Sequence, residues 1–567
     1  MRARARDEEP RLSEAGAVVR RLNASAHMLV ESHRRSFWTD VPAPAVEPTY
    51  LERETDVCIV GAGIAGLTIG LELVKQGARV TILDDGEIGG GETGRTSAHL
   101  ASAVDDRFTA IARRFGARGA RLVAESHAAA IDWIERTIHE YAIDCDFERV
   151  NGYLFAPPGT RQVRRAQRAL ERELAAATDA GLAVRRVECV PLPFDPGPAL
   201  VFADQAQFHP LKYLYGLARA FVARGGRLHE RVHVRRIAPG QPLTVEVDGD
   251  RVLHARTVVD AANAAITSPV KLATRLAAYR SYVLGFEIPR GLIPHALYWD
   301  TADPYHYLRV APAAEASREI LIAGGEDHRV GQGDPATAWL ELEAWVRRWF
   351  PDAGRIVARW SGQILEPNDG LAFIGRSPDL EHAFVVAGDS GNGLTHGTIA
   401  GLLIPALMRG ERPAWADVYD PRRTRLHAFG TMLAEATRST MPYAQWLAAG
   451  DVASVDEIPS GHGAVIRRGL HLVAVYRDEA GALVERSATC THLRGAVRWN
   501  PGERSWDCPC HGSRFDPYGN VVNGPAVAPL GPAPVSARPE LPDGHERVCP
   551  PAAVSPEPEV HGPLLRR

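Results

Sequence analysis

Two short clusters near the C-terminal end of the chain combine cysteine with histidine. Cys490 and His492 form a C-x-H pattern, and Cys508 and His511 form a C-x-x-H pattern after a gap of 15 residues. Thiolate and imidazole groups bind zinc and iron in proteins. Two cysteines and two histidines would satisfy one tetrahedral zinc, so the clusters predict a metal centre that holds either zinc or iron.

The way the ligands are divided favours iron. Zinc sites of this composition pair Cys with Cys and His with His, whereas each cluster here supplies one of each. Two facing loops of this kind can give both cysteines to one iron and both histidines to a second, which is the Rieske [2Fe–2S] ligand set. Residues 452–535 resemble a Rieske domain, with Pro509 stiffening the second loop and Ser513 offering a hydroxyl to the cluster sulfurs.

Two positions depart from the high-potential Rieske proteins that this region resembles. Those proteins join their two loops by a disulfide, but Gly495 stands where the partner of Cys510 is expected. They also carry a tyrosine where Phe515 stands. Cys510 is therefore predicted to be a free thiol and not a fifth ligand. With fewer bonds to the cluster, we expect a midpoint potential in the lower half of the roughly −150 to +300 mV range.

A glycine motif lies near the start of the chain. The stretch VGAGIAGL places Gly61, Gly63 and Gly66 between an apolar run and a helical pattern, and Asp84 ends the next strand-like run 18 residues after Gly66. Such glycines let a backbone approach a pyrophosphate at a helix N-terminus, while the acidic residue accepts a bond from a ribose hydroxyl. The motif predicts a dinucleotide site but does not choose between FAD and NAD.

Two later stretches favour FAD. One is GGGETGRTSAH at residues 89–99, and the other is AGDSGNGLTHG at residues 387–397, which leads into an apolar helix. A helix start beneath the isoalloxazine ring would stabilise negative charge on the reduced flavin. The cofactor-binding residues predicted in these stretches are Thr93, Arg95, Gly388, Gly391 and Gly393.

Residues 50–410 resemble the D-amino-acid oxidase-like family of FAD-dependent oxidoreductases. The resemblance rests on VGAGIAGL with Asp84, FHPLKYLYGLARA, VHVRRI, TVVDAANA, RWSGQILEPNDGLAFIG and the 387–397 turn. It implies that Val234 contacts adenine through its backbone and that the enzyme oxidises C–N bonds of amines or amino acids by hydride transfer. Some members attach FAD through a histidine at the position of Arg95, so we expect non-covalent FAD here.

Two residues are candidates for work on the substrate. Arg309, in the alternating run YHYLRV, could hold a carboxylate by a bidentate pair, although a salt-bridged structural arginine is the more ordinary interpretation. His396, beside the 387–397 turn, could tune the flavin, donate a bond to substrate or act as a base. Asp389 and Asn392 are typical turn-forming residues.

The succession of helical and strand-like patterns along the chain predicts an α/β protein with several domains. We expect a Rossmann-like FAD-binding domain and an interleaved α+β substrate domain over 51–435, and an all-β Rieske domain over 456–536. Residues 1–50 read as a flexible extension with a docking segment around Phe37 and Trp38. Residues 436–455 read as a linker, and the proline-rich 537–567 as a disordered tail.

Composition limits which binding partners and which compartment are expected. The formal net charge of −4 gives no electrostatic support for nucleic-acid binding. The seven cysteines are mostly isolated, which suits a reducing compartment, and we expect a cytoplasmic protein. No apolar run is long enough for a membrane span, and the first residues do not resemble a secretory signal.

The two cofactors together predict a dehydrogenase. A flavin accepts two electrons and a Rieske cluster passes one at a time, so the substrate's electrons would leave through the cluster to an external acceptor. The alternative is an electron-transfer or reductase module with no small amine substrate of its own. A Rieske oxygenase would need a mononuclear iron site, and no H-x₄-H-like pair with a distant Asp stands out.

Overall fold

The protein is described from a computed structural model, which covers residues 36–44, 50–159, 163–423, 446 and 449–534. The extension predicted to be flexible, most of the predicted linker 436–455 and the predicted tail 537–567 fall outside these residues. Among the described helices, none has the length and apolar character needed to cross a membrane.

The first sheet is a doubly wound, mainly parallel layer. Its main strand order is β16-β17-β10-β1-β2-β7. Strand β9 pairs with the first residues of β10, and β8 pairs with β9. The pairs β1–β10, β1–β2, β10–β17 and β2–β7 are parallel. The strands are β1 (Glu54–Val60), β2 (Val80–Leu83), β7 (Arg227–His229), β8 (Val234–Ala238), β9 (Leu243–Val247), β10 (Arg251–Asn263), β16 (Phe373–Arg376) and β17 (Ala383–Ala387).

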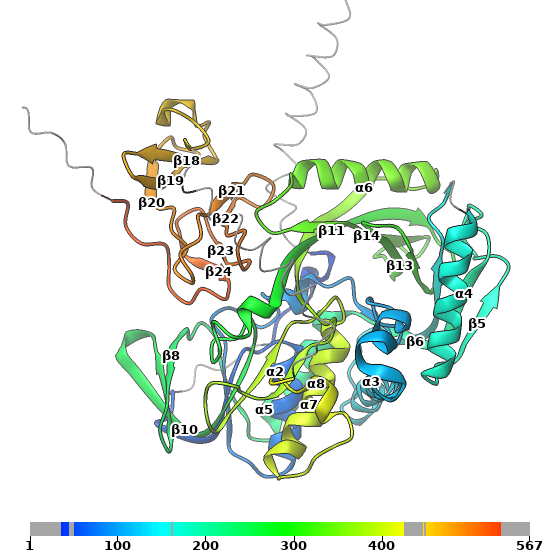
Figure 1. Cartoon of the computed structure of the whole chain (residues 1–567), viewed down its shortest axis with the longest axis horizontal. Coiled ribbons are helices and arrows are strands. Elements are labelled where there is room, and N and C mark those ends of the chain that lie inside the picture. The colour runs from blue at the N-terminus through cyan, green and yellow to red at the C-terminus, as the bar shows by residue number, and fades with distance from the viewer. Residues whose placement is uncertain (1–35, 45–49, 160–162, 424–445, 447–448, 535–567) are drawn as a thin grey trace, which may run out of the picture.

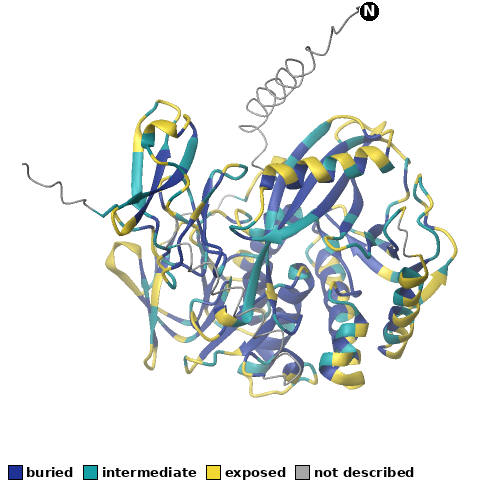
Figure 2. Ribbon diagram, turned by 45° about the horizontal axis from the view of Figure 1, so that its top comes forward, coloured by how far each residue is buried: buried dark blue, intermediate teal, exposed yellow. Residues whose placement is uncertain are grey.

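Apolar helices pack around this sheet. Helix α2 (Ile64–Lys75) lies against α5 (Pro210–Ala223) and α7 (Gly393–Met408), and the short α8 (Ala416–Tyr419) follows. Both α2 and α7 are buried over most of their length because each has neighbours on more than one side. Figure 2 shows this region as dark blue, while yellow exposed positions lie on the outer helices.

The second sheet belongs to the predicted substrate domain. Its strand order is β15-β11-β14-β13-β12-β4-β6-β3, with β5 beside β6. The strands are β3 (His99–Leu100), β4 (Glu148–Phe155), β5 (Val184–Val187), β6 (Ala199–Gln207), β11 (Leu276–Pro289), β12 (Leu297–Asp300), β13 (His306–Pro312), β14 (Arg318–Arg329) and β15 (Ile356–Pro367). Helix α6 (Pro335–Trp349) covers β11 and β14, while α3 (Phe108–Glu140) and α4 (Val163–Asp179) pack together at the other end (Figure 1).

The chain passes between the two sheets several times. It leaves the first sheet after β2, builds β3 to β6, returns for α5 to β10, builds β11 to β15, and comes back for β16, β17 and α7. This interleaving brings segments hundreds of residues apart to one boundary between the sheets.

The C-terminal region is all-β. One sheet contains β18 (His462–Arg468), β19 (His471–Arg477) and β20 (Leu483–Ser487), and the other contains β21 (Arg498–Asn500), β22 (Ser505–Asp507), β23 (Arg514–Phe515) and β24 (Val521–Asn523). Figure 1 shows this region, in orange, seated beside β11 and above the first sheet. The predicted fold class, α/β with an all-β C-terminal domain, is confirmed.

Candidate functional site

A cavity of about 1010 Å³ lies where the first sheet meets the second sheet and the C-terminal region. It opens at the carboxyl ends of β1, β2, β10 and β17, which is where ligands bind in open α/β sheets. Most of the predicted cofactor residues line it, namely Gly61, Gly63, Asp84, Thr93, Arg95, Val234, Gly388, Gly391 and Gly393.

The glycine motif forms a tight cradle at the start of α2. Gly61 has a φ of +102°, and a Cβ there would lie 2.8 Å from the carbonyl oxygen of Ala261. Gly66 does not line the cavity. It packs against the carbonyl oxygen of Gly61, where a Cβ would collide, so its role is to seat α2 on the turn. Glycine at 61 therefore allows the backbone to approach a pyrophosphate, whereas glycine at 66 allows α2 to pack closely on the turn.

Asp84 joins the motif to the adenosine end of the cavity. Its carboxylate accepts bonds from the amides of Ala62 (2.6 Å) and Gly86 (2.9 Å), and burial raises its pKa. Val234 begins β8 and lies in the same part of the cavity wall. The predicted ribose and adenine contacts of these two residues remain predictions.

The 387–397 turn lies at the other end of the cavity. Gly388 and Gly391 have φ values of 76° and 72°, as a glycine turn requires. The amides of two of these predicted cofactor-binding glycines are already bonded, because Gly388 donates to the carbonyl of Asn263 and Gly391 to the side chain of Asp389. The amides at the start of α7, from Gly393 onward, remain to face a bound ring.

Thr93 and Arg95 lie in a short 3₁₀ helix, η2 (Glu92–Arg95), that borders the cavity. The Thr93 hydroxyl accepts a bond from the amide of Ile64 at 3.2 Å, which ties η2 to the start of α2. The Arg95 guanidinium donates to the carbonyl of Ser361 at 3.4 Å. Sequence reasoning found both residues only through the composition of their stretch.

The four predicted metal ligands meet as two pairs. The thiols of Cys490 and Cys508 are hydrogen-bonded to each other, and the rings of His492 and His511 lie edge to face with centroids 5.2 Å apart. Among the described residues, no three His, Cys, Asp or Glu side chains converge on one point. A cysteine pair beside a histidine pair matches a two-iron cluster, in which each iron takes two protein ligands.

The hydrogen bonding of His492 fits a role as an iron ligand. Its Nε2 donates to the carbonyl oxygen of Pro269 at 2.7 Å, and its buried Nδ1 has no partner. Burial lowers the pKa of this imidazole, so a neutral ring protonated at Nε2 leaves the Nδ1 lone pair free for a metal. The residues present therefore fit the group that the spacing predicts.

Comparisons with known proteins agree with both sites. Residues 56–407 match the family model for FAD-dependent oxidoreductases, and residues 448–536 match the model for the Rieske [2Fe-2S] domain. The chain is an FAD-dependent oxidoreductase with a Rieske domain. The predicted cofactors, FAD and a [2Fe–2S] cluster, are confirmed, and zinc is excluded as the resident metal by the Rieske match.

Relatives and solved structures extend this assignment. YhfW of Bacillus subtilis (strain 168), described as a Rieske 2Fe-2S iron-sulfur protein, is 30% identical over 89% of this chain and 99% of its own length. Gamma-glutamylputrescine oxidoreductase of Escherichia coli (strain K12) is 27% identical over 63% of this chain and 84% of its own length. Glycine oxidase from Geobacillus kaustophilus shares the fold with a TM-score of 0.56 and 22% identity, covering 66% of this chain and 100% of its own.

Arg309 does not lie where a substrate arginine was predicted. It is buried beside the FAD cavity, donates to the carbonyls of Ala98 (2.8 Å) and Phe208 (3.0 Å), and lies over the ring of Trp38. It is absent from the cavity wall. Because its guanidinium is directed at backbone carbonyls, we do not propose it as a carboxylate ligand. It holds the segment after η2 in place.

His396 does lie in the cavity wall, on the first turn of α7. Its Nδ1 is 2.9 Å from the carbonyl of Asp389, and its ring packs edge to face on His127. Burial lowers the pKa of His396 to about 4, so the ring is neutral at physiological pH. A carbonyl partner at Nδ1 makes that nitrogen the donor and leaves the buried, unpartnered Nε2 as an acceptor.

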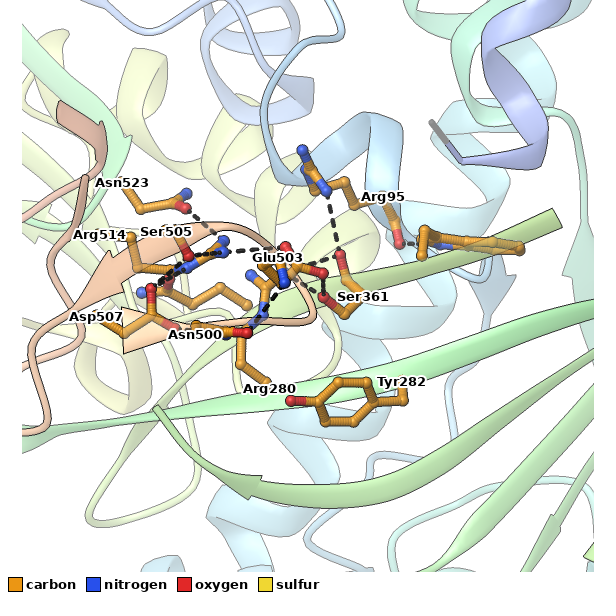
Figure 3. A network of polar contacts seen from close by, with 12 residues as sticks. Arg95, Arg280, Tyr282, Ser361, Asn500, Glu503, Ser505, Asp507, Arg514 and Asn523 are labelled. Carbon is orange, nitrogen blue, oxygen red and sulfur yellow. Dashed lines mark hydrogen bonds and ion pairs between the residues drawn. The ribbon is translucent and has the colours of Figure 1, made fainter. Parts of the chain in front are cut away.

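A buried ionic network joins the Rieske domain to the flavoprotein domain (Figure 3). Glu503 of the Rieske domain pairs with Arg280 of β11 at 2.8 Å and with Arg514 of β23 at 2.9 Å. Ser361 of β15 donates to the same carboxylate. Although burial acts in the opposite direction, the two arginines lower the pKa of Glu503. Arg514 also pairs with Asp507 at 3.0 Å.

The last loop of the Rieske domain forms part of the FAD cavity. Residues 520–529 belong to the cavity wall and run from η2 toward the adenosine end. Asn523 donates to Glu92 at 3.0 Å, and His233 donates through Nε2 to the carbonyl of Val527 at 2.7 Å. The Rieske domain thus walls the flavin site as well as holding the cluster.

Several cavity residues were missed by sequence reasoning. His99, Asp105, Ser281, Trp299, Tyr305 and Tyr307 line the substrate side, and residues 520–529 line the cofactor side. His99 ends the 89–99 stretch, and Tyr305 and Tyr307 lie in the YHYLRV run, but no residue spacing singled any of the missed residues out. Only the fold brings them together, since they come from β3, the loop before α3, β11, β12, β13 and the end of the Rieske domain.

Proposed function

We propose that this enzyme oxidises the C–N bond of an amine or amino acid and passes the electrons singly through its Rieske cluster to an external acceptor. The names of its relatives support the first part, since a gamma-glutamylputrescine oxidoreductase and a glycine oxidase are among the proteins it resembles. When bound, FAD supplies the two-electron oxidant, and the cluster supplies a one-electron route out.

The docking of the Rieske domain carries the proposal. Its ligand loops face the flavoprotein domain, because His492 bonds to Pro269 and the carbonyl of Gly512 accepts a bond from Gln363 at 3.1 Å. Pro269 lies three residues after Ile266, which lines the FAD cavity, and Gln363 lines the cavity itself. Both ligand loops therefore contact segments that border the flavin site.

The chain's own groups support flavin chemistry in the cavity. The closely packed turn at Gly388 and Gly391 and residues 520–529 form the wall of its cofactor side. The neutral His396 offers an acceptor at the start of α7 and adds no positive charge that would repel a cationic amine. The amides at the start of α7 favour the negative charge that develops on a reduced ring.

An anaerobic substrate panel tests the proposal. We expect one class of amine or amino acid to bleach the flavin absorbance in the absence of oxygen, and the pyridine nucleotides NADH and NADPH to leave it unchanged. If no amine or amino acid reduces the flavin while NAD(P)H or a protein reductant does, the chain is instead an electron-transfer module. A Cys508→Ser protein, which lacks the cluster but keeps the flavin site, should be bleached by the same compounds.

A further inference from the structure

The substrate side of the FAD cavity has a distinct chemical character. We call it the acidic aromatic face, and it comprises Asp105, Trp299, Tyr305, Tyr307, His99 and Ser281. These residues come from the second sheet and from the loop that precedes α3. They surround the space that a substrate must enter to reach the flavin end.

Asp105 lies at the centre of this face. Its carboxylate packs on Gly391, where a Cβ would collide with it, and its backbone amide donates to the side chain of Asn392 at 3.1 Å. Asp105 therefore touches the glycine turn that borders the flavin end of the cavity. The Tyr305 hydroxyl donates to the Asp105 carboxylate at 3.3 Å.

Aromatic rings continue the face away from Asp105. The ring of Tyr305 lies 5.7 Å from that of Tyr307, and Tyr307 lies 5.6 Å from the imidazole of His99. Trp299 is the register partner of Tyr307 on β12. Tyr307 is fixed by a hydrogen bond of 2.8 Å to Ser281. Electron-rich ring faces beside a carboxylate form the environment that recognises organic cations.

The same face offers no cation to a substrate carboxylate. Among the described lining residues, the arginines are Arg95, which donates to Ser361, and Arg235, which pairs with Asp250 at 2.9 Å near the adenosine end. Burial lowers the pKa of His99 to about 3, so this imidazole is neutral. Arg107 lies near Asp105 but is not part of the cavity wall.

Asp105 itself has no ion-pair partner within 4 Å among the described residues, although its side chain is exposed in the cavity. Desolvation by the protein walls around the cavity, together with the neighbouring Asp106, raises the pKa of Asp105 to about 7. A carboxyl group in this condition gains most from an incoming positive charge, which would hold it in its ionised form. A negative charge at the same place would be opposed.

We propose that the substrate is a cationic amine without an α-carboxylate, held with an ammonium group beside Asp105 and its carbon skeleton against Tyr305 and Tyr307. This inference rests on the proposed function and narrows its substrate class from amines and amino acids to amines. A charged carboxylate on this face would meet Asp105 with no cation beside it in the described cavity wall, and a poorly compensated charge in such a site is costly.

Matched pairs of compounds test the substrate class on the holoenzyme. The pairs are 1,4-diaminobutane with ornithine, 1,5-diaminopentane with lysine, and 2-phenylethylamine with phenylalanine, which differ only in the α-carboxylate. Under anaerobic conditions, both flavin reduction and the perturbation of the oxidised flavin spectrum are recorded. We expect the amine of at least one pair to bind about tenfold or more tightly than its carboxylated counterpart.

The outcomes separate this inference from the proposed function. An amine that perturbs the oxidised spectrum without reducing the flavin supports the cation site and contradicts the proposed oxidation. Reduction by the amino acids in preference to the amines supports the oxidation and overturns the cation site. Absence of binding by every amine in the set also overturns it.

Two variants test whether Asp105 and Tyr305 bind the amine. Asp105→Asn should raise the amine Kd by about tenfold to a hundredfold, the loss of one charge-assisted hydrogen bond, while the FAD content stays unchanged. Tyr305→Phe removes only the hydroxyl and should raise it a few-fold. Asp352→Asn, an exposed acid after α6, is the matched control and should leave the Kd unchanged. An unchanged Kd in the Asp105→Asn and Tyr305→Phe proteins contradicts the site.

Discussion

The cluster site and the FAD site are built in opposite ways. All four cluster ligands lie between Cys490 and His511, on two loops of one small domain. The FAD cavity takes its wall from residues as far apart as Val60 and Pro529, carried by both large sheets and by the Rieske domain. The cluster site is thus local, whereas the flavin site depends on how three parts of the molecule are held together.

This difference between a local and a dispersed site determines which contacts each cofactor depends on. Loss of a ligand should remove the cluster and leave FAD, because no cluster ligand is part of the FAD cavity wall. Loss of a docking contact should act in the other direction, since residues 520–529 wall the flavin site while the ligand loops keep their own internal bonds. The predictions below are ways to break this asymmetry.

The largest effect is expected at a cluster ligand. Cys508→Ser should abolish the EPR signal of the reduced Rieske centre completely, because a serine hydroxyl does not replace a thiolate on iron. FAD should remain bound at full occupancy. Cys510→Ser is the matched control, since Cys510 is adjacent but is not one of the four ligands, and its protein should keep the signal. A Rieske signal in the Cys508→Ser protein would disprove the ligand assignment.

The next largest effect is expected at the docking network, the buried ionic contacts of Glu503 with Arg280 and Arg514. Glu503→Gln leaves Arg280 and Arg514 without their shared carboxylate, and breaking such a buried pair costs about 3–5 kcal/mol. We expect a lower melting temperature of the Rieske unit and weaker retention of FAD. Glu485→Gln is the control. It breaks the ion pair with Arg468, which is more exposed than the Glu503 network, and should lower the free energy of unfolding by about 1 kcal/mol or less.

The docking network also has a pH dependence with a definite sign. Because the pKa of Glu503 is lowered in the folded protein, its contribution is present above the pKa of an unfolded glutamate, about 4.3. It is lost as pH falls through the lower folded-state value. Thermal melts of the wild type should therefore lose stability below about pH 4.3 more steeply than those of Glu503→Gln. Equal slopes would show that the pair does not stabilise docking.

A smaller effect is expected at the loop that walls the flavin. Asn523→Ala removes one hydrogen bond to Glu92 and one to Arg514, each contributing about 1 kcal/mol. FAD should dissociate several-fold faster, as measured by the recovery of free-flavin fluorescence. Ser454→Ala, which removes one hydrogen bond from a turn of the Rieske domain that is not part of the cavity wall, is the control. Equal release rates of FAD from the two variants would show that the loop does not contribute to FAD retention.

The smallest effect is expected on the potential of the cluster. Phe515 is buried in the same core cluster as Cys490 and Cys508, and we expect the hydroxyl of a Phe515→Tyr protein to donate to a ligand sulfur. One such bond favours the reduced, more negative cluster by on the order of 60 mV, or about 1.4 kcal/mol. The wild-type midpoint should lie in the lower half of the roughly −150 to +300 mV range. A redox titration with the wild-type midpoint near the top of that range would contradict this account.

The contrast between the sites also explains what the sequence could predict. The Rieske ligands and the glycines of α2 were found because their chemistry is encoded by short spacings, and Gly495 indeed faces Cys510, with a Cβ there only 2.5 Å from its sulfur. Both domains and both cofactors follow from such motifs.

The substrate side could not be predicted in the same way. Asp105, Tyr305 and Tyr307 become neighbours only through the crossing of the chain between the two sheets, and no local pattern records that meeting. Arg309 is the opposite case, because the sequence offered it as a candidate carboxylate ligand beside the more ordinary interpretation of a structural arginine. An arginine in an alternating strand resembles a carboxylate ligand, but burial directs it to the backbone carbonyls after η2.

Electron passage between the two sites is the central claim, and rapid-freeze EPR on a single anaerobic turnover tests it most directly. After mixing with a reducing amine, the flavin absorbance should fall first, and the signal of the reduced Rieske cluster should then rise as one of the flavin's two electrons passes to it. The second electron should leave only when an external one-electron acceptor is added. The Glu503→Gln protein should show a slower second phase. A flavin that stays fully reduced while the wild-type cluster remains oxidised would contradict the account.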